Sequence, residues 1–128
     1  MQDLTYLTYA ADELHYFITA YKAGFRYNAM VSQAQRICEC YMKHLIQSKS
    51  LMNVSEIMRS HNLRAIYDEI LSMGIDLRCV HSYILILNNY YGYTRYPGKD
   101  SFLATDEDVV ACYEALIPVV THITTLLV

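Results

Sequence analysis

The sequence predicts an all-α fold in one domain spanning residues 1–128. Apolar residues recur at three- and four-residue spacing in five segments, and no segment shows the two-residue alternation of a strand. Hydrophobic residues make up 54% of the chain and charged residues 18%, as in a compact globular domain. Two prolines and four glycines are too few for a turn-rich β fold. These observations favour an up-and-down bundle of about five helices.

The first helix is expected to start at Asp3 as its N-cap and to break between Gly24 and Asn28. One apolar stripe at helical spacing consists of Leu4, Leu7, Ala11, Leu14, Ile18, Tyr21 and Phe25. Four other aromatic residues lie off this stripe, namely Tyr6, Tyr9, Tyr16 and Phe17. Either a homodimer interface or the second helix can cover them, and the sequence leaves both explanations open.

The second helix is expected to begin at Asn28. Its buried face comprises Met30, Val31, Ala34, Ile37, Cys38, Tyr41 and Leu45. Glu39 and Lys43 are four residues apart in the favourable order, which predicts an intrahelical ion pair worth about 0.3–0.5 kcal/mol. This pair needs no binding site to explain it.

The third helix follows a short turn over residues 54–58, which Asn53 and Glu56 open with a capping-box pattern. Either Ser60 or Asn62 caps the helix, and Gly74 ends it. The residues expected to face inward are Leu63, Ile66, Ile70 and Met73.

The fourth helix is expected to start at Asp76 and to finish near Gly92. Its buried face comprises Leu77, Val80, Ile84, Leu87 and Tyr91. Thr105 and Asp108 form a capping-box pattern that starts the final helix. Pro118 should kink that helix, because the carbonyl of Glu114 loses its partner. The residues expected to be buried there are Val109, Cys112, Leu116, Val119, Ile123 and Leu126.

The segment between the last two helices is rich in tyrosine and carries the best candidate for a functional residue, Arg95. Pro97 biases Tyr96 towards extended backbone, which places both residues on a bend. Guanidinium and phenol groups at a helix end can bind phosphate or stack on a base. Arg95 can equally tether the loop to Asp100 or Asp106.

Charge and cysteine content narrow the function classes. A net charge of −3 means that nucleic acid would need a local basic patch. No signal peptide is expected, and the C-terminal apolar tract looks too short to span a bilayer, which favours a cytoplasmic protein. The four cysteines lack metal-site spacing. Cys40 and His44 share a face, but no further ligand lies near them, so neither a metal nor another cofactor is expected.

Three motifs, in order, resemble those of HEPN domains. Ala34-Gln35 with Glu39 and Lys43 is similar to their "AQ…E…LK" signature. The run from Ser60 to Arg64 looks like their "H-(D/N)-L" motif, and the run from Thr94 to Gly98 looks like their "(A/T)-RYP-(D/G)" motif. The resemblance implies a helical, often homodimeric, domain associated with nucleotides or RNA. It also implies a possible nucleotidyltransferase partner protein, as in toxin–antitoxin systems.

Ribonuclease members of this superfamily carry an Arg followed one to two helical turns later by a His. Here the first His after Arg95 is His122, too far along the chain. The interpretation is therefore a non-catalytic binding module with no membrane association. The expected ligand-binding residues are His61, Asn62, Tyr91, Arg95 and Tyr96. The alternative is a divergent, metal-independent HEPN ribonuclease that uses Arg95 with a Tyr or His from elsewhere in the fold.

Overall fold

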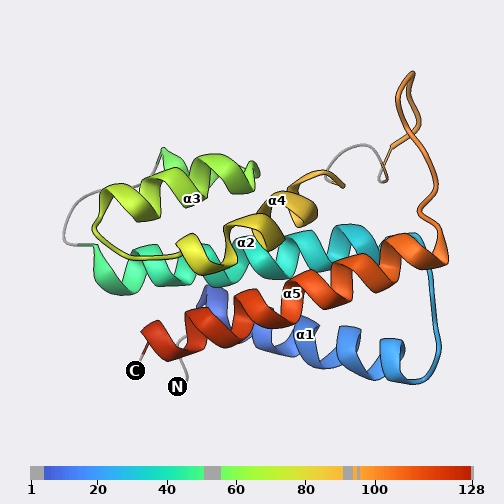
Figure 1. Ribbon diagram of the computed structural model, residues 1–128, viewed down its shortest axis with the longest axis horizontal. Helices are drawn as coiled ribbons and strands as arrows, with labels where there is room; N and C mark the ends of the chain where they lie inside the picture. The colour runs from blue at the N-terminus through green and yellow to red at the C-terminus, as the bar shows by residue number, and fades with distance from the viewer. Residues whose placement is uncertain (1–4, 51–55, 91–93, 95, 128) are drawn as a thin grey trace.

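A computed structural model describes residues 5–50, 56–90, 94 and 96–127, and these residues form five α-helices, two short 3₁₀ helices and no strand. The helices are α1 (Tyr6–Lys22), α2 (Ala29–Lys49), α3 (Leu63–Ser72), α4 (His81–Asn88) and α5 (Asp106–Leu126) (Figure 1). The 3₁₀ helices are η1 (Ile57–Arg59) and η2 (Arg78–Val80). The prediction of an all-α bundle is confirmed.

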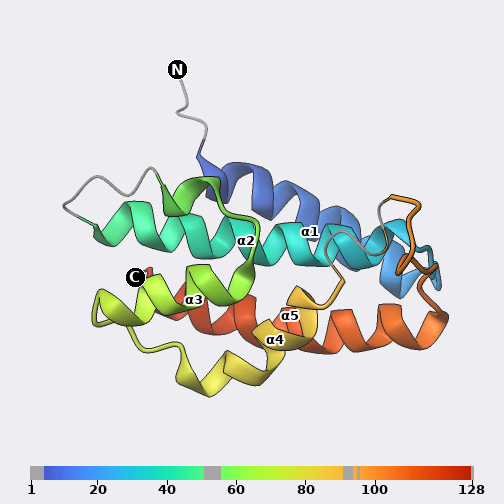
Figure 2. The ribbon, with the colours of Figure 1, turned by 90° about the horizontal axis from the view of Figure 1, so that it is seen from above.

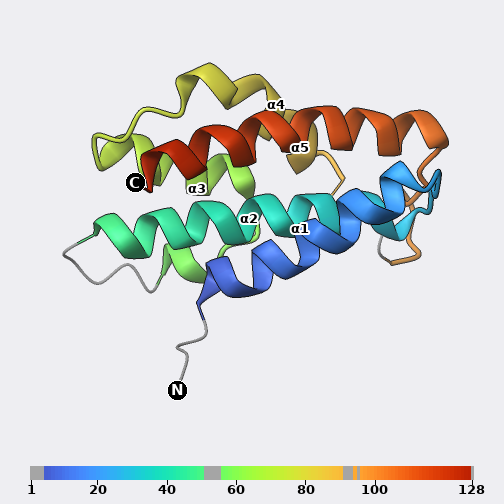
Figure 3. The ribbon, with the colours of Figure 1, turned by 90° about the horizontal axis from the view of Figure 1, so that it is seen from below.

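Helix α2 lies at the centre of the bundle and contacts each of the other four α-helices. Helices α1, α2 and α5 run along the long axis of the molecule, and the shorter α3 and α4 pack at one edge (Figures 2 and 3). Every residue on the predicted buried face of α2 is at most 5% exposed. A polar side chain on the inner side of this helix is therefore surrounded by the rest of the bundle.

Helix α1 begins later than predicted and buries a different set of residues. Its N-cap is Thr5, whose hydroxyl accepts a hydrogen bond from the Thr8 amide at 3.2 Å, so the prediction of Asp3 is wrong. Ala10 and Phe17 are the buried residues of the helix, whereas Ala11 is exposed and Ile18 is half-buried. The helix is oriented so that the Phe17 ring faces the core.

The aromatic residues off the predicted stripe have two different environments. Phe17 is fully buried, with its ring centroid 6.3 Å from that of Tyr113 on α5, and Tyr6 is half-buried. Tyr9 and Tyr16 remain 56% and 66% exposed. The chain therefore covers only part of this aromatic set by itself. Phe25, predicted to be buried, is also exposed, because α1 ends at Lys22 and Gly24 follows it at φ +93°.

The predicted boundaries of the middle helices are largely confirmed. Helix α2 follows Asn28, and Asn62 caps α3 by accepting hydrogen bonds from the amides of Arg64 and Ala65. Gly74, at φ +82°, ends α3 as expected. The Asp76 carboxylate accepts from the Arg78 amide at the start of η2, and α4 begins only at His81. Asn53 and residues 54 and 55 lie outside the described residues.

Helix α4 is shorter than predicted, whereas α5 spans the predicted residues. Helix α4 ends at Asn88, and Gly92, where the end was expected, lies outside the described residues. Thr105 and Asp108 form the predicted capping box, and α5 continues through Pro118 as one helix; the kink there stays a prediction. Its 21 residues are long and apolar enough to cross a membrane, contrary to the estimate from the sequence. A buried core helix meets the same criterion, and α5 packs against both α2 and α4.

Candidate functional site

Helix α2 carries three buried polar side chains on one face. Gln35, Glu39 and Lys43 follow each other at four-residue spacing, which places them one turn apart. Counted over whole residues, their exposed fractions are 1%, 5% and 3%. Charged residues are almost never this buried unless they are paired, so the arrangement must satisfy each of them internally.

The Glu39 carboxylate is the centre of the arrangement. Lys43 Nζ donates to its Oε2 atom at 2.9 Å, and His61 Nδ1 lies 3.0 Å from the same oxygen. Gln35 Nε2 donates to Oε1 at 3.4 Å and to the backbone carbonyl of His61 at 3.0 Å. Because an ionised carboxylate can only accept, the ring nitrogen that faces Glu39 is the one that carries a hydrogen. Glu39 therefore fixes the orientation of the imidazole ring.

The His61 side chain connects this buried network to the surface. It is 55% exposed, whereas its partner Glu39 is 7% exposed. The backbone next to it is also held in place: the Leu63 amide donates to Asn88 Oδ1 at 2.8 Å, and Asn88 Nδ2 donates to Asn62 Oδ1 at 3.3 Å. The start of α3 is thus attached to α2 through Gln35 and Glu39, and to the end of α4 through Asn88.

The ion pair between Glu39 and Lys43 differs from the surface pair that the sequence predicted. Its two side chains are 7% and 3% exposed, and it has a third member, His61, from 22 residues further along the chain. The predicted intrahelical pair is present, but the energy typical of exposed helix pairs does not apply to it, because both charges are buried. The available signal was the apolar character of the sequence around the pair: Ile37, Cys38, Met42 and Leu45 lie close to Glu39 and Lys43 along α2, and all four are fully buried.

The tyrosine-rich segment is anchored to the start of α2 by one side chain. Asn28 Nδ2 donates to the Thr94 carbonyl at 2.8 Å, and Asn28 Oδ1 accepts from the Ala104 amide at 2.7 Å. The Thr94 hydroxyl donates to the Tyr90 carbonyl at 2.9 Å. Asn28 precedes α2 but does not cap it with its side chain, because both of its polar atoms are used across the chain.

Tyr90 attaches the same segment to α5. Its hydroxyl donates to Asp108 Oδ1 at 2.9 Å. Burial and this contact with Asp108 raise the pKa of the Tyr90 hydroxyl well above its usual range. The backbone amide of Thr105 and the Tyr90 hydroxyl lower the pKa of the Asp108 carboxyl. These bonds favour a neutral phenol beside an ionised carboxylate.

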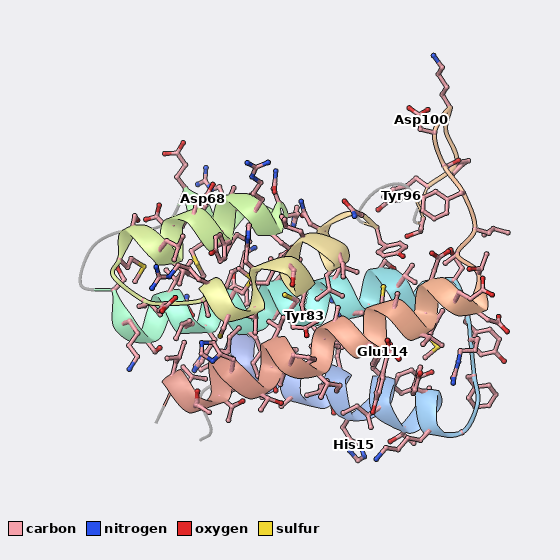
Figure 4. The ribbon with its side chains drawn as sticks, viewed as in Figure 1. His15, Asp68, Tyr83, Tyr96, Asp100 and Glu114 are labelled. Carbon is pink, nitrogen blue, oxygen red and sulfur yellow. The ribbon has the colours of Figure 1, made fainter. Side chains whose placement is uncertain are left out.

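The predicted site residues fall into two places. His61 and Asn62 lie together at the start of α3. Tyr96 is 65% exposed and lies in the segment that projects from the bundle with Asp100 (Figure 4). It lines a cavity of about 480 Å³ whose other lining residues are Asn28, Thr94, Pro97, Ser101, Phe102 and Leu103. Neither His61 nor Asn62 lines that cavity. Tyr91 and Arg95 lie outside the described residues.

The described residues contain no group of three or more His, Cys, Asp or Glu side chains placed to hold a metal ion. Cys40 and His44 have no third ligand in that part of the chain, and burial is the largest cause that raises the pKa of the Cys40 thiol. The polar groups at the start of α3 include the side-chain amide of Asn62 and the imidazole of His61. Such a group can donate or accept a hydrogen bond to a phosphate, a sugar hydroxyl or a base, or carry a proton.

Comparison with known proteins identifies a family. The family model described as HEPN domain matches residues 5–123, which is nearly the whole chain. The match supports a module related to nucleotides or RNA. No curated protein matches the chain. No solved structure matches it either.

Proposed function

The chain belongs to the HEPN domain family, and we propose that it is a binding module that holds a nucleotide or RNA at the surface around His61 without cutting it. Asn62, next to His61 at the start of α3, belongs to this surface, and both side chains are exposed. We assign Arg95, Tyr91 and Tyr96 to the same function, as its basic and aromatic groups.

The observation that carries the proposal is the contact between Glu39 and His61. A buried carboxylate holds one side of an imidazole ring that is 55% exposed, at 3.0 Å. A hydrogen bond at one ring nitrogen of a histidine sets the tautomer and the orientation of the ring, and a group that is fixed before its ligand arrives loses less entropy on binding. A histidine needed only for capping would not require a buried charge, because Asn62 already caps α3.

The same contact favours a second candidate function, metal-independent cleavage of RNA. An imidazole paired with a carboxylate can move a proton in general acid–base catalysis. This candidate is the weaker one, because cleavage in the family uses a His that follows Arg, and no His follows Arg95 before His122. A cleavage assay in the presence of a metal chelator separates the two candidates.

We also propose that the module is a homodimer. Four large aromatic side chains near α1 and the start of α2 are exposed, namely Tyr9, Tyr16, Phe25 and Tyr27. Tyr16, Phe25 and Tyr27 line an apolar cavity of about 440 Å³. Sedimentation at about 50 μM should give a dimer if an interface of standard size forms. A monomer at that concentration contradicts this proposal.

The family resemblance is the basis for two further proposals, a cytoplasmic location and a nucleotidyltransferase partner protein. Purification of the tagged chain from its native cells, followed by mass spectrometry, tests the partner. Recovery of a nucleotidyltransferase at a stoichiometric level would support it, and its absence from repeated purifications would count against it.

The binding proposal is tested by the affinity for a short single-stranded RNA and for a mononucleotide, measured by fluorescence anisotropy and calorimetry. His61→Ala should weaken binding by roughly tenfold or more, as expected when a hydrogen bond to a charged group is lost. His15→Ala is a matched control, because His15 is exposed on α1 at the opposite edge of the bundle from α3 (Figure 4). Arg95→Ala should weaken binding and leave the melting temperature nearly unchanged. Equal affinities for wild type and His61→Ala would reject the site.

A further inference from the structure

Two arginines flank His61 and make no ion pair or side-chain hydrogen bond within the described part of the chain. Arg59 ends η1, Arg64 lies in the first turn of α3, and both are exposed. The other arginines of that part are all engaged. Arg26 donates to two backbone carbonyls, and Arg36 and Arg78 form ion pairs with Glu13 and Asp76.

The surface between these arginines is locally basic in an acidic protein. The chain has a net charge of −3, yet residues 59–64 contain two arginines and one histidine and no acidic residue. This is the local basic patch that nucleic acid binding requires in a chain of this overall charge.

The backbone at the start of α3 has no donors left for an anion. The Leu63 amide donates to Asn88, the amides of Arg64 and Ala65 donate to Asn62, and the Ile66 amide donates to the Asn62 carbonyl. An anion at this surface must therefore be bound by side chains. The guanidinium groups of Arg59 and Arg64 are the charged donors available.

The shape of the surface favours an extended ligand. Small molecules bind in concave sites that bury most of their area, whereas a nucleic acid strand can bind an open basic surface through its phosphates. The His61 side chain is 55% exposed, and Arg59, Asn62 and Arg64 beside it are also exposed. A ligand with a single phosphate would engage one arginine, whereas a strand offers a separate phosphate to each of the two arginines.

We propose that Arg59 and Arg64 contact successive phosphates of a single-stranded RNA that lies across His61. This proposal rests on the proposed function. It goes beyond it by identifying the two phosphate-binding residues and by assigning the site to a strand with several phosphates.

The test is the salt dependence of affinity for a ten-nucleotide single-stranded RNA, with uridine monophosphate as the one-phosphate probe. Each phosphate contact contributes about 0.7 to the slope of log K against log salt, or about 2.6-fold in affinity between 50 and 200 mM. Arg59→Gln and Arg64→Gln should each reduce the slope by about 0.7, and the double variant by about 1.4. Arg64→Lys keeps the charge and should keep the slope. Uridine monophosphate should bind more weakly and show the smaller slope of a single contact.

Lys22→Gln is the matched control, because it removes one exposed positive charge at the far end of α1. A slope unchanged in both arginine variants, with binding still lost in His61→Ala, would overturn this inference and leave the proposed function standing. An equal loss of slope in Lys22→Gln would also overturn it, because the effect would then come from overall charge. If neither RNA nor uridine monophosphate binds the wild type, both proposals fail.

Discussion

Glu39 is the residue on which the candidate site depends. Its carboxylate accepts hydrogen bonds from Lys43 and His61, and Gln35 and Lys43, one turn away on either side along α2, are both buried. Glu39→Gln removes the charge while keeping the shape, and leaves the Lys43 ammonium buried without a counter-charge. We expect the free energy of unfolding to fall by about 3–5 kcal/mol, as when one member of a buried pair is removed. Urea denaturation followed by circular dichroism measures this.

Two further variants identify the cause of that loss. Glu13→Gln removes one partner of the more exposed pair with Arg36 and should cost less than about 1 kcal/mol. The double variant Glu39→Gln Lys43→Met removes both buried charges and should recover much of the stability, because an apolar pair avoids the cost of burying ions. If Glu39→Gln is no more harmful than Glu13→Gln, the buried network does not stabilise the fold.

At the scale of single residues, the sequence predicts which residues belong to the candidate site better than it predicts their contacts and burial. It identifies His61 and Asn62, and the family signature includes Gln35, Glu39 and Lys43. It does not predict the contact between Glu39 and His61, because these residues are 22 positions apart and only the packing of α3 on α2 brings them together. The i,i+3 and i,i+4 pairing rule concerns residues of the same helix, so it cannot predict a contact between two helices.

At the scale of elements, the side chain of Asn28 links α2 to both ends of residues 94–104. Asn28→Ala leaves the Thr94 carbonyl and the Ala104 amide without this partner. We expect a loss of about 1–3 kcal/mol and faster hydrogen exchange at the Ala104 amide. Asn89→Ala is the control, because Asn89 is an exposed asparagine just after α4. Unchanged exchange at Ala104 would show that Asn28 does not hold the segment.

The start of α5 makes stability depend on pH in the acid range. The Thr105 amide and the Tyr90 hydroxyl lower the pKa of the Asp108 carboxyl below its ordinary value of 3.8 in the folded state. A lowered folded pKa stabilises the protein above the ordinary value, and this contribution is lost as pH falls towards the folded pKa. Wild type should therefore lose more stability than Asp108→Asn between about pH 4 and pH 2.

Asp68→Asn is the control for this comparison, because Asp68 is exposed on the outer side of α3, away from α5 (Figure 4). Denaturation at several pH values gives both dependences. If acid lowers the free energy of unfolding equally in wild type and in Asp108→Asn, the capping box does not cause this pH dependence.

The elements themselves were predictable where local chemistry decides them. The cap at Asn62, the capping box of Thr105 and Asp108, and the glycine stop at Gly74 are all present. The orientation of α1 was not predictable, because several of its faces carry apolar residues and packing on α2 and α5 decides which of them are buried. The end of α4 at Asn88 depends similarly on the bond from Leu63 to Asn88.

At the scale of the whole molecule, the bundle presents its candidate site at an edge and its core around α2. The buried part of α2 supplies Glu39 and Lys43, and the shorter α3 supplies the surface residue His61. The family match covers residues 5–123 and so includes all of these residues. The proposed binding function requires that the exposed side of the His61 ring contacts a nucleotide or RNA.

One measurement tests most directly the claim that the surface around His61 binds RNA without cutting it. Imidazole ¹H–¹⁵N correlation spectra of the wild-type protein are recorded while a short single-stranded RNA is added, and the RNA is then checked on a denaturing gel. Our account predicts that the His61 ring signals shift and saturate, that those of His15 stay in place, and that the RNA remains intact. Unshifted His61 signals at saturating RNA would contradict it. Cleavage of the RNA by the wild-type protein, with no cleavage by the His61→Ala variant, would also contradict it.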